Sequence, residues 1–188
     1  MIVYVHGFNS SARSFKAKVL RERLAALARG DEFACPELAH RPRQAIAQLE
    51  AVIAASRQPP ALIGSSLGGF YATWLAEKYG LKAVLVNPAV RPYESLRDCL
   101  GPQQNLYTGA KYEFTTRHLA ELRELETEAV TPERYLLMVR TGDEVLDYRQ
   151  AVEKYRGARQ MVIEGGDHGF GDFADYLDAV LAFCGVAA

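Results

Sequence analysis

Hydrophobic and polar positions form two alternating patterns along most of the chain. Continuous apolar runs, typical of strands covered on both faces in a parallel sheet, lie at residues 2–5, 33–35, 61–65, 83–86, 135–139 and 160–163. Stretches with helical spacing of apolar residues lie between or after them, at 15–27, 42–53, 69–79, 148–155 and 173–184. This alternation predicts an α/β fold of three layers, with a mostly parallel central sheet between helices.

Residues 89–131 break the alternation. Pro92, Gly101-Pro102 and Gly109 interrupt this segment, and its one long helical stretch, at 118–128, carries a narrow seam of leucines among many charges. The segment is longer than a connection between two strands requires. We therefore expect a small helical cap over the strand ends, inserted before the penultimate strand. A packed excursion along the sheet edge is the alternative.

Composition narrows the classes of protein and partner. The chain has 188 residues, of which 49% are hydrophobic, enough for one substantial core, so we expect a single domain over residues 1–188. A formal net charge of −1 provides no field for nucleic acid or an anionic membrane and favours a small-molecule substrate. Without a signal-peptide pattern or an apolar stretch of bilayer length, we expect a cytoplasmic protein, either a monomer or a weak homo-oligomer.

The most informative motif is Gly64-Ser65-Ser66-Leu67-Gly68, which follows an apolar run and opens a helical stretch. Between a strand and a helix, G-x-S-x-G predicts a nucleophile elbow, a tight turn that exposes one serine, here Ser66, above the end of the sheet. Side chains at the two outer glycines would collide with the neighbouring strand and helix. An ordinary loop or a phosphate-binding turn begins in the same way, so the motif needs support from the rest of the chain.

Polar residues at other strand ends provide that support. Asp143 follows the penultimate predicted strand and His168 follows the last one. Because ligands bind at the carboxyl ends of parallel strands, these residues are expected to meet Ser66. The order Ser, Asp, His is that of α/β-hydrolases. We predict that Ser66 is the nucleophile, that His168 is its general base, and that Asp143 orients the imidazole.

Neighbouring acidic residues compete with Asp143. Glu144 and Asp147 lie in the same loop, but Asp143 follows the strand directly after Gly142, and Asp147 is suited to cap the next helix. Asp167, beside the histidine, is interpreted as a turn residue.

An esterase also requires two donors for the tetrahedral oxyanion. We predict the backbone N–H groups of Phe8, in the loop after the first strand, and of Leu67, next to the nucleophile.

Three further residues are candidates for substrate binding, namely His6, Asn9 and Arg91. His6 has a structural alternative, in which it fixes the oxyanion loop by hydrogen bonds. Arg91 can equally form a surface salt bridge instead of meeting an anionic substrate group. The two remaining histidines are interpreted as a loop residue, His40, and a solvated helix residue, His118.

With these residues identified, the chain resembles the YqiA-like family of small bacterial esterases in the α/β-hydrolase superfamily. The matching stretches are YVHGFNSSARSFKA, IGSSLGGFYATWLAEKYGLKAVLVNPAVRPYE, RTGDEVLDYRQAV and VIEGGDHGFGDFADY. The resemblance covers nearly the whole chain and is weakest between Asp31 and Pro59. It implies a serine esterase that acts on short acyl esters and acyl-CoA thioesters, with Ser66, Asp143 and His168 as its triad.

Together these observations predict a carboxylic ester hydrolase that works through an acyl-Ser66 intermediate. The chain has no H-E-x-x-H motif, Cys/His cluster or phosphate loop, so we expect neither a metal nor an organic cofactor. One alternative is a lyase or acyltransferase that uses the same triad. Another is a non-catalytic ligand-binding protein on a hydrolase fold, since fold alone does not decide function.

Overall fold

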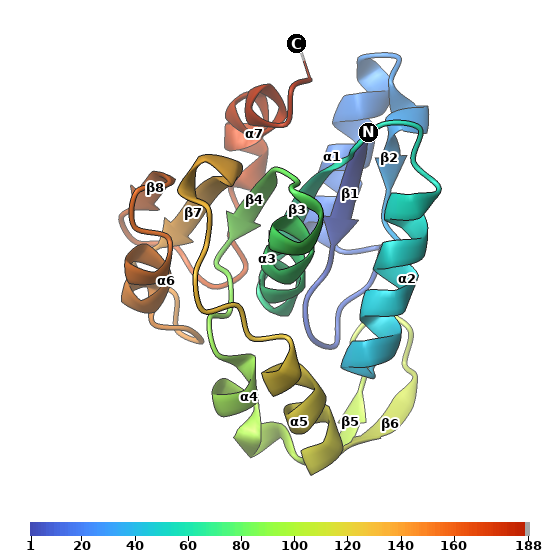
Figure 1. Cartoon of the computed structure of the whole chain (residues 1–188), viewed down its shortest axis with the longest axis vertical. Coiled ribbons are helices and arrows are strands. Elements are labelled where there is room, and N and C mark those ends of the chain that lie inside the picture. The colour runs from blue at the N-terminus through green and yellow to red at the C-terminus, as the bar shows by residue number, and fades with distance from the viewer. Residues whose placement is uncertain (187–188) are drawn as a thin grey trace.

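The computed structural model describes residues 1–186. Figure 1 shows a central sheet with helices on both faces and a separate group of elements beyond one end of the sheet. The strands are β1 (Ile2–Val5), β2 (Phe33–Ala34), β3 (Ala61–Ser65), β4 (Ala83–Val86), β5 (Gly101–Gln104), β6 (Lys111–Phe114), β7 (Tyr135–Arg140) and β8 (Arg159–Ile163). The α-helices are α1 (Phe15–Ala26), α2 (Pro42–Ala54), α3 (Leu67–Tyr79), α4 (Pro92–Ser95), α5 (Thr116–Glu124), α6 (Tyr148–Lys154) and α7 (Leu177–Phe183). Short 3-10 helices are η1 (Gly30–Glu32), η2 (Arg97–Cys99), η3 (Pro132–Arg134) and η4 (Phe173–Tyr176).

Six strands form the main sheet in the order β2-β1-β3-β4-β7-β8, and every neighbouring pair is parallel. After β1 the chain moves to β2 at one edge, and from β3 onward it moves toward the other edge. The direction therefore reverses between β1 and β3. In open α/β sheets, the crevice outside the carboxyl ends of the strands at such a switch point is where ligands bind. The predicted three-layer α/β fold with a parallel sheet is confirmed.

Two hydrophobic cores hold the helices against the sheet. On one face, apolar side chains of α2, α3 and α6 pack against alternate residues of the strands, such as Val3, Leu62 and Leu85. On the other face, α1 and α7 pack against the intervening strand residues, such as Tyr4 and Ile63. Because strand side chains alternate between the faces, a strand buried on both sides has to be apolar throughout. This explains the continuous apolar runs.

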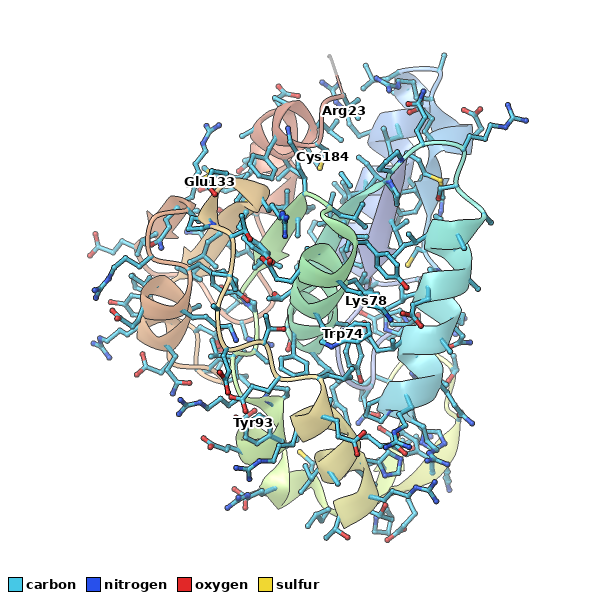
Figure 2. All side chains as sticks on the ribbon, in the orientation of Figure 1. Arg23, Trp74, Lys78, Tyr93, Glu133 and Cys184 are labelled. Atoms are coloured by element: carbon cyan, nitrogen blue, oxygen red, sulfur yellow. The ribbon has the colours of Figure 1, made fainter. Side chains whose placement is uncertain are left out.

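Helix α3 illustrates how one helix face meets its neighbour. Lys78 donates a hydrogen bond to Glu50 of α2 at 2.7 Å, and its ammonium lies 4.6 Å from the centre of the Trp74 ring. Figure 2 shows Trp74 and Lys78 on the side of α3 that faces α2. These contacts bridge the solvent edge between the two helices while the apolar side of α3 remains in the core.

The segment between β4 and β7 differs in part from the predicted helical cap. It contains the short helix α4 and the helix α5, and also the antiparallel hairpin β5–β6, which the hydrophobic pattern did not reveal. These elements lie together at the bottom of the view in Figure 1, beyond the end of the sheet. The expected helix at 118–128 is observed at Thr116–Glu124.

The interpretation of His118 as a solvated residue is wrong. Its side chain is buried, its Nδ1 accepts a hydrogen bond from the Thr115 N–H at 3.0 Å, and its Nε2 lies 3.1 Å from Nδ1 of His40. His118 therefore completes the capping box at the start of α5, in the place usually taken by Glu or Gln. His40 is an exposed loop residue, as expected.

The helices within residues 1–186 are all too short, or too polar, to cross a bilayer.

Candidate active site

Ser66 occupies a strained turn between β3 and α3. Its backbone has φ 55° and ψ −123°, a conformation that costs a residue with a Cβ about 1–3 kcal/mol. The flanking glycines make the turn possible. A Cβ at Gly64 would lie 2.4 Å from the carbonyl oxygen of Gly68, and a Cβ at Gly68 would lie 1.9 Å from the carbonyl oxygen of Val5. The chain therefore folds back on itself closely enough to expose the Ser66 side chain above the sheet.

Ser66, His168 and Asp143 form one hydrogen-bonded chain. Nε2 of His168 lies 3.0 Å from Oγ of Ser66, and Nδ1 of His168 lies 2.8 Å from Oδ2 of Asp143. A carboxylate can only accept, so Nδ1 carries the proton and the unprotonated Nε2 accepts from the serine hydroxyl. This is the tautomer in which the imidazole can take a proton from Ser66.

The Asp143 carboxyl is buried and well satisfied. Its Oδ1 accepts hydrogen bonds from the N–H groups of Val145, at 2.9 Å, and Leu146, at 2.8 Å. Burial by itself would raise the pKa of Asp143, but the hydrogen bonds from His168 and these N–H groups outweigh burial and lower the pKa below its ordinary value. Asp147 instead caps α6 by accepting from the Arg149 N–H at 3.1 Å.

Asn87, the residue that follows β4, fixes the loop that carries His168. Its Nδ2 donates to the carbonyl oxygens of Asp167 and His168, both at 3.1 Å, and its Oδ1 accepts from the Arg140 N–H at 2.9 Å. Asn87 thereby joins the ends of β4 and β7 to this loop. Its position after β4 and before Pro88 was the only available signal.

The two predicted oxyanion donors belong to residues near Ser66. Leu67 is the first residue of α3, so its N–H has no partner within the helix. The loop after β1 runs against the serine, because a Cβ at Gly7 would lie 3.2 Å from Cβ of Ser66. Phe8 follows in that loop, and within residues 1–186 its N–H donates to no backbone carbonyl.

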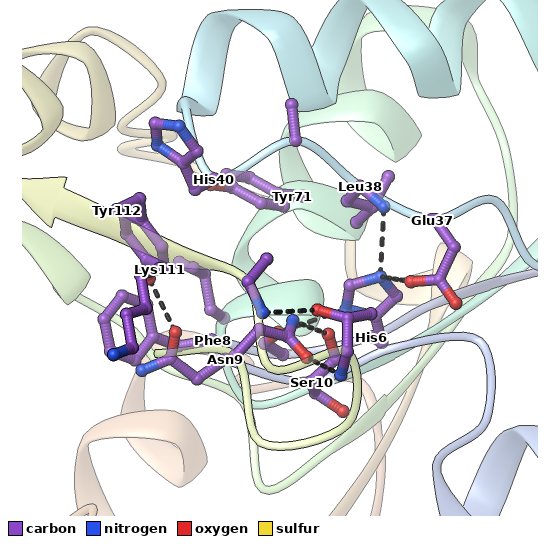
Figure 3. Close-up of a pocket in the computed structure, with 16 residues that line it drawn as sticks. His6, Phe8, Asn9, Ser10, Glu37, Leu38, His40, Tyr71, Lys111 and Tyr112 are labelled. Carbon is purple, nitrogen blue, oxygen red and sulfur yellow. Dashed lines mark hydrogen bonds and ion pairs between the residues drawn. The ribbon is translucent and has the colours of Figure 1, made fainter. Parts of the chain in front are cut away.

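His6 and Asn9 are used within the fold. Nε2 of His6 accepts from the Leu38 N–H at 3.2 Å, and Nδ1 lies 3.2 Å from the Gly7 carbonyl oxygen, so the buried ring holds the β1–α1 loop (Figure 3). Burial lowers the pKa of His6, in keeping with a neutral imidazole that accepts at Nε2. Asn9 donates to Oε1 of Gln103 at 2.9 Å and accepts from the Tyr112 hydroxyl at 2.7 Å, which attaches the β5–β6 hairpin to the same loop.

Arg91 does not come together with the other candidates. It precedes α4, its side chain is 58% exposed, and its nearest carboxylate oxygen belongs to Glu126 at 4.0 Å. It lines a small hollow with Val145 and Leu146 rather than a pocket that contains Ser66.

Two pockets meet at the β1–α1 loop. One, of about 300 Å³, presents more apolar than polar surface and is drawn in Figure 3. Its apolar and aromatic lining includes Leu38, Leu67, Tyr71 and Tyr112, and Glu37 and Lys111 are among its polar residues. The second, of about 280 Å³, contains Ser66 and His168. Gly7, Phe8 and Ser10 line both pockets, so Ser66 lies beside two separate spaces that the two parts of a substrate could occupy.

A parallel sheet with helices on both faces, with a serine at a strained strand-to-helix turn, defines an α/β-hydrolase fold. Solved structures agree. Alpha/beta hydrolase domain-containing protein 10 from mouse matches with a TM-score of 0.71 and 16% identity, over 96% of this chain and 89% of that one. Est1E from Butyrivibrio proteoclasticus matches with a TM-score of 0.70 and 15% identity, over 96% and 84%.

The chain belongs to the family described as "Uncharacterised protein family (UPF0227)", which matches residues 1–185. A UPF0227 protein from Pectobacterium atrosepticum is 25% identical over 97% of this chain and 98% of that protein. UPF0227 protein YcfP from Salmonella paratyphi A is 22% identical over the same shares of the two chains. The family resemblance predicted from the sequence motifs is confirmed.

Proposed function

We propose that this protein is a serine esterase that hydrolyses carboxylic esters through an acyl-Ser66 intermediate. The observation that carries the proposal is the hydrogen-bonded chain from Ser66 through His168 to Asp143, with separations of 3.0 Å and 2.8 Å. A serine hydroxyl is a weak nucleophile near neutral pH and requires a base at such a distance. The α/β-hydrolase fold, which an esterase domain from Rhodothermus marinus shares, also supports it.

The proposed reaction has two stages. Nε2 of His168 accepts the Ser66 proton as Oγ attacks the acyl carbon, and the N–H groups of Phe8 and Leu67 stabilise the oxyanion. Protonated His168 then donates its proton to the leaving alcohol. Asp143 holds the ring and stabilises its positive charge throughout. In the second stage, Nε2 of His168 takes a proton from a water molecule as the water attacks the acyl-Ser66 carbonyl. The C–Oγ bond then breaks, His168 returns the proton to Oγ of Ser66, and the acid is released.

The apolar pocket of Leu38, Leu67 and Tyr71 is suited to the acyl chain. Leu67 supplies both part of its lining and one oxyanion donor, so a carbonyl oxygen bound by that donor places the acyl portion next to this pocket. At about 300 Å³ the pocket fits a short or medium chain. We therefore propose short acyl esters as the substrate class, and place the segment of residues 89–131 over the site as a cap.

The test is hydrolysis of p-nitrophenyl esters of increasing chain length by the wild type and by Ser66→Ala. We expect turnover by the wild type and a loss of about 10⁶ in kcat for the variant. Reaction in ¹⁸O-labelled water separates hydrolysis from the alternatives: a hydrolase incorporates the label into the released acid, whereas an acyltransferase or lyase does not. Undiminished hydrolysis by a folded Ser66→Ala variant would exclude Ser66 as the nucleophile.

A further inference from the structure

The pocket that contains Ser66 and His168 also contains an unusual buried cation. Lys16, near the start of α1, is only 9% exposed and lines this pocket. Its ammonium donates to the carbonyl oxygen of Gly169, next to His168. Within residues 1–186 it forms no salt bridge with any carboxylate. The carboxylate of Asp167, whose charge raises the pKa of Lys16, lies beyond salt-bridge distance.

Two other buried charged side chains, unlike Lys16, form ion pairs. Arg140 forms an ion pair with Asp172, and the carboxylate of Glu121 pairs with Arg41. A buried charge without a partner is costly, which is why such groups are nearly always paired. Burial lowers the pKa of Lys16 to about 8, so the ammonium stays mostly charged at neutral pH. An anionic group of a ligand would supply a counter-charge within hydrogen-bond distance, which Asp167 does not.

A second, independent feature of the pocket points to the same kind of ligand. Ser14 precedes α1 and is 7% exposed, yet its hydroxyl does not cap the helix and makes no hydrogen bond of good geometry within residues 1–186. Ser14 lines the pocket. Its polar neighbour is the hydroxyl of Tyr4, which lines the same pocket. The first turn of α1 contains no acidic residue, so the partial positive charge at this helix end is not neutralised locally. A hydroxyl, an ammonium and a helix N-terminus thus converge on one space.

The position of His168 indicates which part of the substrate enters this space. The imidazole donates its proton to the leaving alcohol, so the alcohol portion lies on the His168 side of the scissile bond. His168 and Gly169 line the Lys16 pocket but not the apolar pocket. We propose that Lys16 and Ser14 bind a carboxylate on the alcohol portion, so that the substrates are acyl esters of hydroxy acids. A single ammonium matches one negative charge. The inference rests on the proposed esterase function.

The experiment compares butyrate esters of 3-hydroxybenzoate and 3-hydroxybenzamide, which are similar in size but differ in charge. The measured quantity is the ratio of their kcat/KM values. We expect the wild type to favour the carboxylate ester, and Lys16→Met to lower this ratio at least about 10-fold, as loss of a charged hydrogen bond implies. Lys154→Met is the matched control, because Lys154 is half-buried and donates to the Thr127 carbonyl oxygen at 2.8 Å, outside this pocket.

Three results would overturn the proposal. An unchanged ratio in Lys16→Met, with both esters slowed equally, would mean that Lys16 only positions the His168 loop. A preference for the phenyl monoester of glutarate over phenyl pentanoate that disappears in Lys16→Met would show that Lys16 binds a carboxylate on the acyl portion instead. An equal fall of the kcat/KM ratio in Lys154→Met would show that the preference for the carboxylate ester depends on the overall charge of the protein and not on Lys16.

A binding measurement separates this inference from the esterase proposal. In the Ser66→Ala protein, 3-hydroxybenzoate should raise Tm more than 3-hydroxybenzamide, and adding Lys16→Met should remove that difference. If the wild type hydrolyses neither ester but this difference is observed, the esterase proposal fails and the carboxylate site stands. If both esters are hydrolysed and the difference is absent, the carboxylate site is wrong.

Discussion

At the level of single residues, the close packing of the turn around Ser66 predicts that a side chain at Gly68 destabilises the fold. A Cβ at Gly68 would overlap the carbonyl oxygen of Val5 at 1.9 Å, so Gly68→Ala has to displace β1 or α3. We expect a loss of at least about 1–3 kcal/mol in the free energy of unfolding, measured by urea denaturation. Gly171→Ala is the control, because a Cβ there meets no atom within 4 Å. Equal stability of the two variants would contradict the packing described for the turn.

The two aspartates after β7 have different roles, and their substitution should therefore affect different quantities. Asp143→Asn removes the acceptor that holds the His168 tautomer and should lower kcat by about 10⁴. Asp147→Ala removes the cap of α6 and should cost about 1 kcal/mol of stability while changing kcat little. Ester hydrolysis and urea denaturation measure the two effects separately. A large loss of kcat in Asp147→Ala, but not in Asp143→Asn, would mean that Asp147 is the acid that orients His168.

Residues at strand ends were the most predictable part of the candidate site. Ser66, Asp143 and His168 each follow an apolar run, and parallel strands bring such positions to one edge. The neighbourhood of Lys16 was not predictable. Its side chain lies in the amphipathic stretch of α1, where a lysine ordinarily faces solvent, and only tertiary packing places it beside Gly169.

At the scale of elements, the contact between α5 and the loop before α2 includes two histidines, with Nε2 of His118 3.1 Å from Nδ1 of His40. Burial, and then the neighbouring His40, lower the pKa of His118. Below pH of about 6.5 the unfolded chain therefore binds a proton that the folded protein excludes, so stability falls as the pH falls. The slope for one such proton approaches 1.4 kcal/mol per pH unit.

His118→Gln tests this linkage. Gln retains an acceptor for the Thr115 N–H in the capping box but does not titrate. We expect the variant to lose less stability than the wild type between pH 7 and pH 5, measured by urea denaturation at each pH. His6 and His40 still titrate in the variant, so the dependence is reduced rather than abolished. An identical pH dependence in the two proteins would show that His118 does not contribute.

The main-sheet strands and the helices that cover them followed from the sequence, whereas the β5–β6 hairpin did not. Gly101–Gln104 contains no β-branched residue and carries no strong strand signal. Tertiary contacts hold the hairpin in place, because Asn9 forms hydrogen bonds with Gln103 of β5 and Tyr112 of β6. Such cross-chain contacts override weak local propensity.

At the scale of the whole molecule, the arrangement of layers positions chemistry from distant parts of the sequence. Ser66 and His168 are 102 residues apart in the chain, yet their side chains are in hydrogen-bond contact. The reversal of strand order between β1 and β3 creates the crevice in which they meet. The β1–α1 loop lies between an apolar pocket and the Lys16 pocket, to which we assign the acyl and alcohol portions of the proposed substrate.

Covalent labelling with a fluorophosphonate shows whether His168 activates Ser66 without requiring a known substrate. Intact-protein mass should show one adduct on the wild type and none on a folded Ser66→Ala variant. An equal extent of labelling in that variant would place the reactive nucleophile elsewhere. A folded wild-type protein that forms no adduct would show that Ser66 is not activated, and would contradict the proposed esterase mechanism.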